Sequence, residues 1–254
     1  MKLKLLIITI IISITSTQII RAQNLKWSNN TADILEQGRK EAGIFAPLKT
    51  GWKNNTELSV HPLWFFIIPN ASIKKQWKSN EKFRFSSKHT FTYPTMLYNM
   101  ISTEGAGGIL PETSTIPQLF KLNSTALLSI DKFNQTFTFT AGADLCLSIG
   151  DSDFPYIEWH FVYPRTYSLN NTITPHAGIN ATGVLYGNFI YEYRFETFFL
   201  TNADAGVITE NQLKISWLKS DKFAIKAGMI YSYGKFPFDN DGGLYPTFDL
   251  MFGF

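Results

Sequence analysis

Apolar and polar residues alternate with a period of two over many segments of this chain, and short runs of Gly, Asn, Asp and Pro separate the segments. In residues 136–147, apolar side chains take every second position, and mostly Thr, Gly and Asp take the others. Successive side chains of a β-strand point to opposite faces, so this pattern predicts strands with one apolar and one polar face. Residues 157–163, 189–195, 213–217 and 223–233 repeat it, which indicates an all-β fold.

Composition decides where such strands can lie. Aromatic residues make up 15% of the chain and Phe alone accounts for 22 positions, yet the mean hydropathy is only −0.05. A chain with this average can be embedded in a membrane only if apolar residues facing lipid alternate with polar residues facing inward. We therefore predict a transmembrane, antiparallel, up-and-down β-barrel.

The number of strands is less well defined. Further strands are predicted at residues 41–52, 56–66, 71–78, 82–93, 119–130 and 245–254. The tally is eleven, whereas single-chain bacterial barrels have an even number. One strand is missing, either before residue 41 or inside 165–181, or two strands are merged. We predict about twelve strands, with ten as the alternative.

Connection lengths predict the orientation, because long loops of such barrels face outward and short turns face the periplasm. Residues 94–117 form the longest irregular connection, with a possible short helix at 95–101. Residues 165–181 conflict with this rule, because they are long and fall on the periplasmic side in the predicted order.

The first 22 residues have the features of a cleaved secretory signal. Lys2 and Lys4 precede the apolar run 5–14, and the small residue Ala22 offers a cleavage site. The alternative, a membrane anchor, needs roughly twice as many apolar residues. We expect residues 23–254 to form a barrel in a bacterial outer membrane.

Charge and cysteine content exclude other classes of protein. Without its first 22 residues the chain has 20 basic and 20 acidic residues, so it lacks the basic field with which nucleic-acid-binding proteins recruit phosphates. Cys146 is the only cysteine, which excludes an intramolecular disulfide and a cysteine-based zinc cluster. No cofactor-binding fingerprint is present, and we predict no cofactor.

Two resemblances support the membrane interpretation. The C-terminal alternation of Phe248, Leu250, Phe252 and Phe254 looks like the signal that the outer-membrane barrel assembly machinery recognises, although an edge strand of a soluble protein could also end in Phe. The segments 43–51, 57–63 and 69–74 resemble an uncharacterised family of outer-membrane β-barrel proteins from Bacteroidota. The resemblance implies a location and a fold but no activity.

The polar face of the predicted strands defines a candidate lumen. Its charged members are Glu57, His61, Arg84, Lys88, Asp144, Glu158, His160, Glu192, Arg194, Glu196, Lys214, Lys226 and Asp249. Charges shielded from water need partners. They either neutralise one another in a filled lumen, as Arg194 would with neighbouring acids, or line a narrow water-filled path for small solutes.

Two chemical alternatives remain. Ser59 with His61, and Ser87 with His89, share a strand face and could be the nucleophile and base of a lipid hydrolase. Glu158 and His160, with His61 opposite, would supply only part of a metal site. We predict that the protein is not an enzyme and holds no metal.

The function most compatible with the sequence is a structural or porin-like role, with passive passage of small solutes. The alternatives are a surface interaction protein that acts through residues 94–117, and the lipid hydrolase. The expected partners are the lipid bilayer, the assembly machinery and small solutes.

Overall fold

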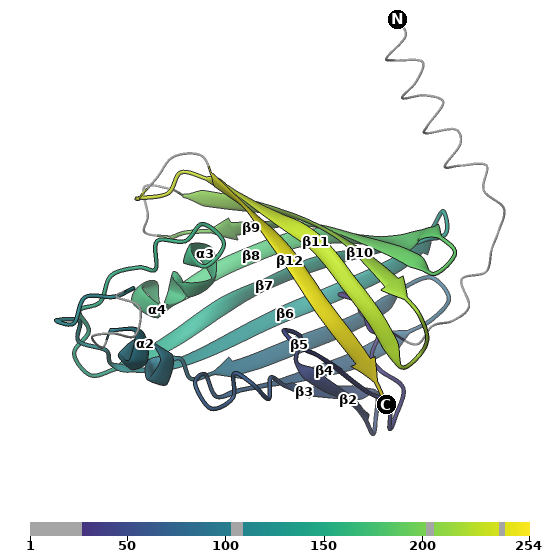
Figure 1. Ribbon diagram of the computed structural model, residues 1–254, viewed down its shortest axis with the longest axis horizontal. Helices are drawn as coiled ribbons and strands as arrows, with labels where there is room; N and C mark the ends of the chain where they lie inside the picture. Colours follow the sequence, from purple (N-terminus) through teal and green to yellow (C-terminus); the bar gives the residue numbers. More distant parts are fainter. Residues whose placement is uncertain (1–26, 103–108, 202–205, 239–241) are drawn as a thin grey trace, which may run out of the picture.

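The computed structural model describes residues 27–102, 109–201, 206–238 and 242–254. Twelve strands close into a barrel in which each strand pairs with its neighbours in sequence and β1 pairs with β12 (Figure 1). Every pair is antiparallel. The prediction of an up-and-down barrel of twelve strands is confirmed.

The strands differ widely in length. Their bounds are β1 Lys40–Gly43, β2 Leu48–Trp52, β3 Thr56–Val60, β4 Asn70–Ser79, β5 Arg84–Thr92, β6 Gln118–Lys132, β7 Gln135–Ile149, β8 Ile173–Tyr186, β9 Phe189–Phe199, β10 Val207–Leu218, β11 Phe223–Gly234 and β12 Gly242–Gly253. The first three have four or five residues, whereas β6 and β7 have 15 each. The wall is therefore much lower at β1–β3 than at β6 and β7.

Short turns and long connections lie at opposite ends of the barrel, which we call the short-turn end and the long-loop end. The short-turn end holds the connections 53–55, 80–83, 133–134, 187–188 and 219–222. Asn54, Asn55, Phe133, Asn134 and Gly187 have positive φ there, as tight hairpins require. The pairing of Glu41 with Gly253 places the start of β1 and the end of β12 at this end.

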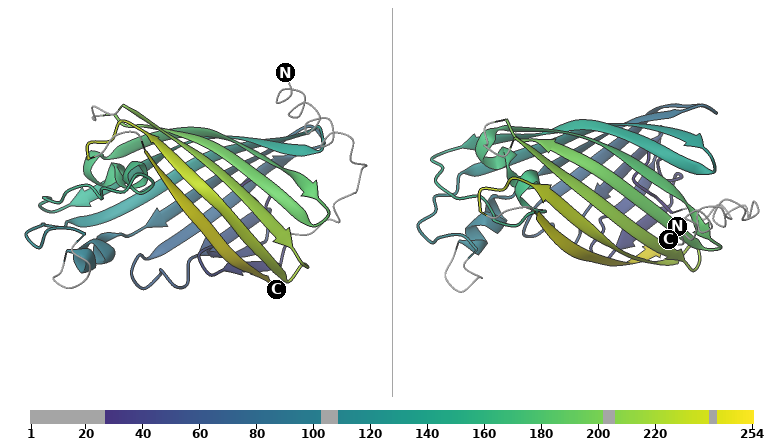
Figure 2. Two further views of the ribbon diagram at one scale, coloured as in Figure 1. Left: turned by 45° about the horizontal axis from the view of Figure 1, so that its top comes forward. Right: turned by 90° about the horizontal axis from the view of Figure 1, so that it is seen from above.

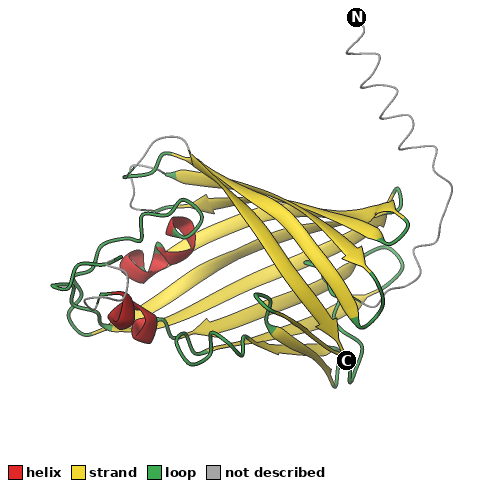
Figure 3. Ribbon diagram, in the orientation of Figure 1, coloured by secondary structure: helices red, strands yellow, loops and turns green. Residues whose placement is uncertain are grey.

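Three helices gather at the long-loop end: α2 (Thr95–Ile101), α3 (Tyr163–Thr166) and α4 (Ser168–Asn171) (Figure 3). The predicted helix 95–101 is found as α2. The helices close over two apolar clusters, one around Tyr98 and Leu119 and the other around Tyr163 and Phe198. We call this arrangement the helical cap.

Three strand predictions were wrong. Residues 157–162 are an irregular loop that leads into α3, because Ile157 and Tyr163 pack into the helical cap instead of facing outward. Residues 41–52 form two strands, β1 and β2, and the strand predicted at 56–66 ends at Val60 as β3. One of the places considered for a missing strand is confirmed, because β8 begins inside 165–181. The connection 150–172 therefore belongs to the long-loop end, and the conflict in orientation disappears.

The outer surface of the barrel is apolar and the inner surface is polar. On β7, Phe139 and Leu145 are exposed while Thr138 and Asp144 are buried, and on β10 Ile215 is exposed. Such a continuous apolar exterior is unfavourable in water and suits lipid. Within the described residues, no helix is long and apolar enough to cross a membrane. The strands run strongly tilted around the barrel, as the two views of Figure 2 show.

Candidate functional site

Residues 27–37, which we call the N-terminal segment, cross the lumen at the short-turn end. The segment begins at Trp27, near the β10–β11 turn. The Nε1 of Trp27 donates to the carbonyl oxygen of Ser220 in this turn at 2.9 Å. Ten residues later, Gln37 forms a parallel bridge with Gly51 of β2. Gly51 is required there, because a side chain would collide with the backbone of Glu36. The segment therefore passes from one side of the barrel mouth to the other.

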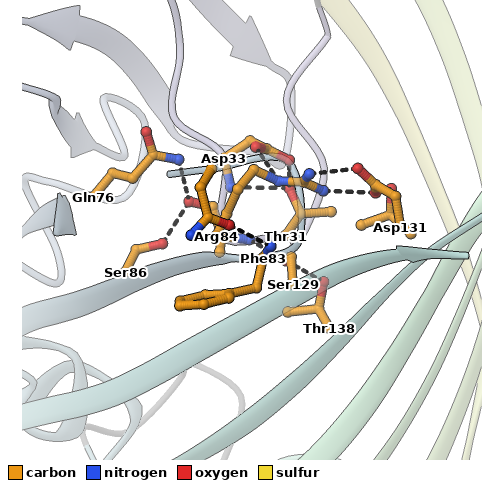
Figure 4. Close-up of polar contacts among 12 residues, drawn as sticks. Thr31, Asp33, Gln76, Phe83, Arg84, Ser86, Ser129, Asp131 and Thr138 are labelled. Atoms are coloured by element: carbon orange, nitrogen blue, oxygen red, sulfur yellow. Dashed lines mark hydrogen bonds and ion pairs between the residues drawn. The ribbon is translucent and has the colours of Figure 1, made fainter. Parts of the chain in front are cut away.

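The wall holds the middle of the segment through buried hydroxyl groups. The amide nitrogen of Ala32 donates to Ser129 Oγ at 2.7 Å, and Ser129 Oγ is also 2.7 Å from Thr138 Oγ1. Ser86 Oγ and Gln76 Nε2 both donate to the carbonyl oxygen of Ala32. Figure 4 shows these side chains converging on the segment. Both backbone polar groups of a fully buried residue are thus satisfied, as burial requires.

Charged side chains hold the same part of the segment from the adjacent strands. Lys74 Nζ donates to the carbonyl oxygens of Thr31, at 2.7 Å, and Asp33. Arg84 forms an ion pair with Asp33 at 2.7 Å and a second one with Asp131 (Figure 4). The ammonium group of Lys74 therefore has carbonyl oxygens of the segment as hydrogen-bond acceptors in place of water.

Acidic residues hold the two flanks of the segment. Glu192 accepts a hydrogen bond from Asn30 Nδ2 at 2.7 Å, and Glu57 accepts one from the amide of Leu35 at 3.1 Å. Asn180 Nδ2 donates to the carbonyl oxygen of Asn30 at 3.3 Å. The contacts come from strands on all sides of the mouth, so the segment is a fitted plug.

A polar cavity of about 310 Å³ lies between the plug and the helical cap. Ion pairs line it: Lys121 with Asp144 at 2.9 Å, and Arg194 with Glu196 at 2.6 Å. His176 Nδ1 lies 3.2 Å from Oε1 of Glu196, whereas Arg194 contacts Oε2 of the same carboxylate. Apart from Lys88, the charged side chains of this part of the lumen are paired, and the expected pairing of Arg194 with a neighbouring acid is found.

Arg165 connects the helical cap to the wall. From α3 it forms a two-pronged ion pair with Glu210 of β10. Burial acts to lower the pKa of Arg165, but Glu210 and the more distant Glu196 raise it above its usual value. The pair therefore stays ionised and fixes α3 over the lumen.

Most of the predicted inward residues do face the interior. Those that are buried there, bind the plug or line a cavity are Glu57, Arg84, Lys88, Asp144, Glu192, Arg194, Glu196, Lys214, Lys226 and Asp249. Their strands continue the predicted alternation without interruption.

Three of the predicted inward residues lie elsewhere. Glu158 and His160 are in the loop before α3, where Glu158 is exposed and His160 Nδ1 lies 2.9 Å from the hydroxyl of Tyr245. His61 follows the end of β3, and its Nε2 lies 2.8 Å from the carbonyl oxygen of Phe45. The prediction was wrong for them because the strands assumed there end early or do not exist.

Sequence analysis missed several interior residues. They are Lys49, Lys74, Lys121, Arg165, His176 and Glu210, together with the whole N-terminal segment. Lys121 could have been found, because it alternates with Phe120 and Leu122 in a predicted strand. His176 could not, because its strand was assigned to a loop.

The residues of the two chemical alternatives do not assemble into full sites. His89 Nε2 lies 3.2 Å from Ser87 Oγ, but its Nδ1 faces the hydroxyl of Ser124 at 3.0 Å instead of a carboxylate. This group lies on the exposed side of β5. In the part of the chain that the structure describes, no three His, Cys, Asp or Glu side chains are grouped to hold a metal ion.

The sequence matches no family model and no curated protein. Among solved structures it is similar to a bacterial polysaccharide outer membrane secretin, with 14% identity, a TM-score of 0.43 and coverage of 84% of this chain and 69% of the other. OprD from Pseudomonas aeruginosa is 9% identical, with a TM-score of 0.36 and coverage of 85% and 56%. LpxR from Salmonella typhimurium is 8% identical, with a TM-score of 0.37 and coverage of 89% and 85%.

Proposed function

We propose that the chain is an outer-membrane β-barrel that its own N-terminal segment keeps closed, and that it passes small solutes only when this segment is displaced. The observation that carries the proposal is the hydrogen bonding of Ala32, whose amide and carbonyl groups are both held by side chains of the barrel wall. Removing the plug would leave these buried side chains without partners unless water replaced it.

Three features of the barrel support a place in the outer membrane. Its exterior is apolar, its long connections are at one end, and Phe248, Phe252 and Phe254 are exposed on the C-terminal strand. With the short-turn end in the periplasm, the plug closes the periplasmic mouth. Residues 1–22, the expected export signal, lie outside the described residues, and the relationship to the Bacteroidota barrels stays a prediction.

A conductance measurement tests the closure. The full chain, refolded in planar bilayers, is expected to be silent, since the plug spans the mouth. A triple variant, Lys74→Met, Ser86→Ala and Ser129→Ala, removes four hydrogen bonds between the wall and the plug and is expected to show discrete current steps.

The matched control for this experiment changes the same residue types at exposed positions. It carries Lys82→Met, Ser79→Ala and Ser148→Ala, and we expect it to be as silent as the unmodified chain. A difference in gel mobility between unheated and boiled samples verifies that each variant is folded. Steady current through the unmodified chain, or equal currents in both variants, would refute closure by the plug.

A lipid hydrolase is the weaker candidate, and its support is the 3.2 Å separation of Ser87 and His89. A nucleophile and base at this distance usually depend on a third group that orients the imidazole, and a hydroxyl occupies that place here. Release of fatty acid from phospholipid vesicles that is lost in His89→Ala would favour this candidate over the closed barrel.

A further inference from the structure

A second cavity, of about 550 Å³, lies beside the plug on the side of β9–β12. Four lysines line it: Lys49, Lys88, Lys214 and Lys226. Only two acids, Glu192 and Asp249, line the same cavity. Positive charge therefore exceeds negative charge here, and Lys88 lines the first cavity as well.

Three of these lysines have no direct polar contact in the part of the chain that the structure describes. Within the described residues, Lys88, Lys214 and Lys226 make no hydrogen bond or ion pair, although Lys214 is opposite Glu192 and Lys226 is opposite Asp249 in the strand register. Lys49 donates to Ser28 Oγ at 3.0 Å and lies close enough to the other three to repel each of them. Acids attract the three from a distance: Glu57 attracts Lys88, and Glu192 attracts Lys214 and Lys226.

The two acids of the cavity are already engaged by neutral donors. Glu192 accepts from Asn30 of the plug at 2.7 Å, and Asp249 accepts from the amide of Phe45 at 3.1 Å. Unpaired ammonium groups shielded from bulk water are unfavourable. An anion that enters the cavity would remove this penalty, whereas a cation or a neutral solute would not.

The cavity adjoins an incomplete part of the wall. The four-residue strand β1 pairs with β12 only at residues 251–253, so among the described residues, 242–248 of β12 have no strand partner on that side. Figure 1 shows the neighbouring strands β2 and β3 as short arrows close to the C-terminus. The five residues of β3 rise only about 17 Å, against an apolar band of about 25 Å.

Aromatic residues mark where the cavity reaches this incomplete wall. Phe45 and Phe248 line the cavity, yet they are 62% and 54% exposed. They lie on opposite sides of the unpaired edge, in the β1–β2 connection and on β12. A ligand with a charged group and an apolar part would therefore fit here, with its charged group among the lysines and its apolar part in the membrane.

We propose that the lysine-lined cavity binds a phosphate group with two or more negative charges, either the headgroup of a lipid that enters at the edge of β12 or a soluble phosphate compound that enters through the lumen. Lys88, Lys214 and Lys226 would donate hydrogen bonds to its oxygens, because ammonium groups serve as point-charge donors to phosphate. The site does not require the plug to move.

The test compares three forms of the full chain in detergent. A site variant carries Lys88→Gln, Lys214→Gln and Lys226→Gln. A matched control carries Lys82→Gln, Lys219→Gln and Lys222→Gln, all in exposed turns. The probe for a soluble anion is inorganic pyrophosphate, detected by the rise in melting temperature that a ligand specific for the folded state produces.

The source of the phosphate is tested with lipids. Native mass spectrometry counts the phosphatidic acid molecules retained by each form, with phosphatidylcholine as the comparison lipid. Retention of phosphatidic acid by the unmodified chain and the control, but not by the site variant, would identify a lipid headgroup. A response to pyrophosphate without selective lipid retention would identify a soluble ligand.

We expect the site variant to lose about 100-fold or more in affinity, because each lost charged hydrogen bond is worth more than a neutral one. Without ligand it should melt no lower than the unmodified chain, since the lysines repel one another; a purely structural role predicts lower melting. Equal binding by all three forms, or no binding of either probe, would overturn the proposal.

Discussion

The amide nitrogen of Ala32 donates a 2.7 Å hydrogen bond to Ser129 Oγ, joining two residues that are 97 positions apart in the chain. Both residues are fully buried, so neither group can exchange this partner for water without opening the plug. The contact connects the N-terminal segment to β6 on the far side of the barrel. The contact makes the plug part of the folded structure, so its loss should change the free energy of unfolding.

Replacing Ser129 with Ala should destabilise the protein. The substitution leaves the buried amide of Ala32 and the hydroxyl of Thr138 without this partner, and an unsatisfied buried group costs about 1–3 kcal/mol. The free energy of unfolding in detergent, measured by denaturant titration, is expected to fall by that amount. Ser148→Ala, at an exposed position on β7, should leave it unchanged; an equal loss in both variants would contradict the role of the plug contact.

Replacing Arg84 with Met should loosen the plug without unfolding the barrel. Asp33 would lose its 2.7 Å ion pair with Arg84, while the pairing of β5 with β4 and β6 involves backbone groups alone. Hydrogen exchange followed by mass spectrometry is expected to show faster exchange in residues 31–35 and unchanged exchange in β7. Lys82→Met is the control, and unaltered exchange in residues 31–35 of the Arg84 variant would disprove the anchor.

Replacing Arg165 with Met should weaken the helical cap. Glu210 is only 4% exposed, so removal of the guanidinium leaves a buried carboxylate without its charged partner, at a cost of about 3–5 kcal/mol. The melting temperature should fall in the single variant. It should recover in the double variant Arg165→Met with Glu210→Gln, which removes the charge as well; a double variant that is no more stable than the single one would contradict this account.

Replacing Phe254 with Ser should impair assembly in cells and not folding in vitro. Phe254 is 71% exposed and adds little to the packing of the barrel, so refolded protein should keep its heat-dependent gel mobility. If its ring is part of the assembly signal, the amount of protein in the outer-membrane fraction should fall. Phe133→Ser, at a 78% exposed position in a short turn, is the control and should assemble normally.

Local periodicity was sufficient to predict the barrel, because the two faces of a strand encounter different surroundings over its whole length. It failed for β8, where Pro175 and Gly183 interrupt the apolar face. It also misassigned residues 157–163, since an apolar side chain that packs under a helical cap has the same sequence pattern as one that faces lipid. Alternation indicates that one face of the chain is shielded from water, but it does not show whether lipid or another part of the protein covers that face.

The plug and the lysine-lined cavity could not have been predicted in this way. The segment from Trp27 to Gln37 has no strand period, and its backbone groups find partners on β6 and other distant strands. Lys214 and Lys226 were correctly placed on the inner face, but whether each has a partner depends on side-chain positions across the lumen. The four residues of β1 pair with β12 only at 251–253. The sequence analysis merged β1 with β2 and so did not show this short pairing.

The central claim is that residues 27–37 keep the lumen closed, and its most direct test is the conductance of a chain from which these residues are deleted. Both the deletion variant and the full chain are first shown to be folded by their gel mobility and are then recorded under the same conditions in planar bilayers. The account predicts discrete current steps in the deletion variant and silence in the full chain. A folded deletion variant that stays silent, or a full chain that conducts equally well, would contradict it.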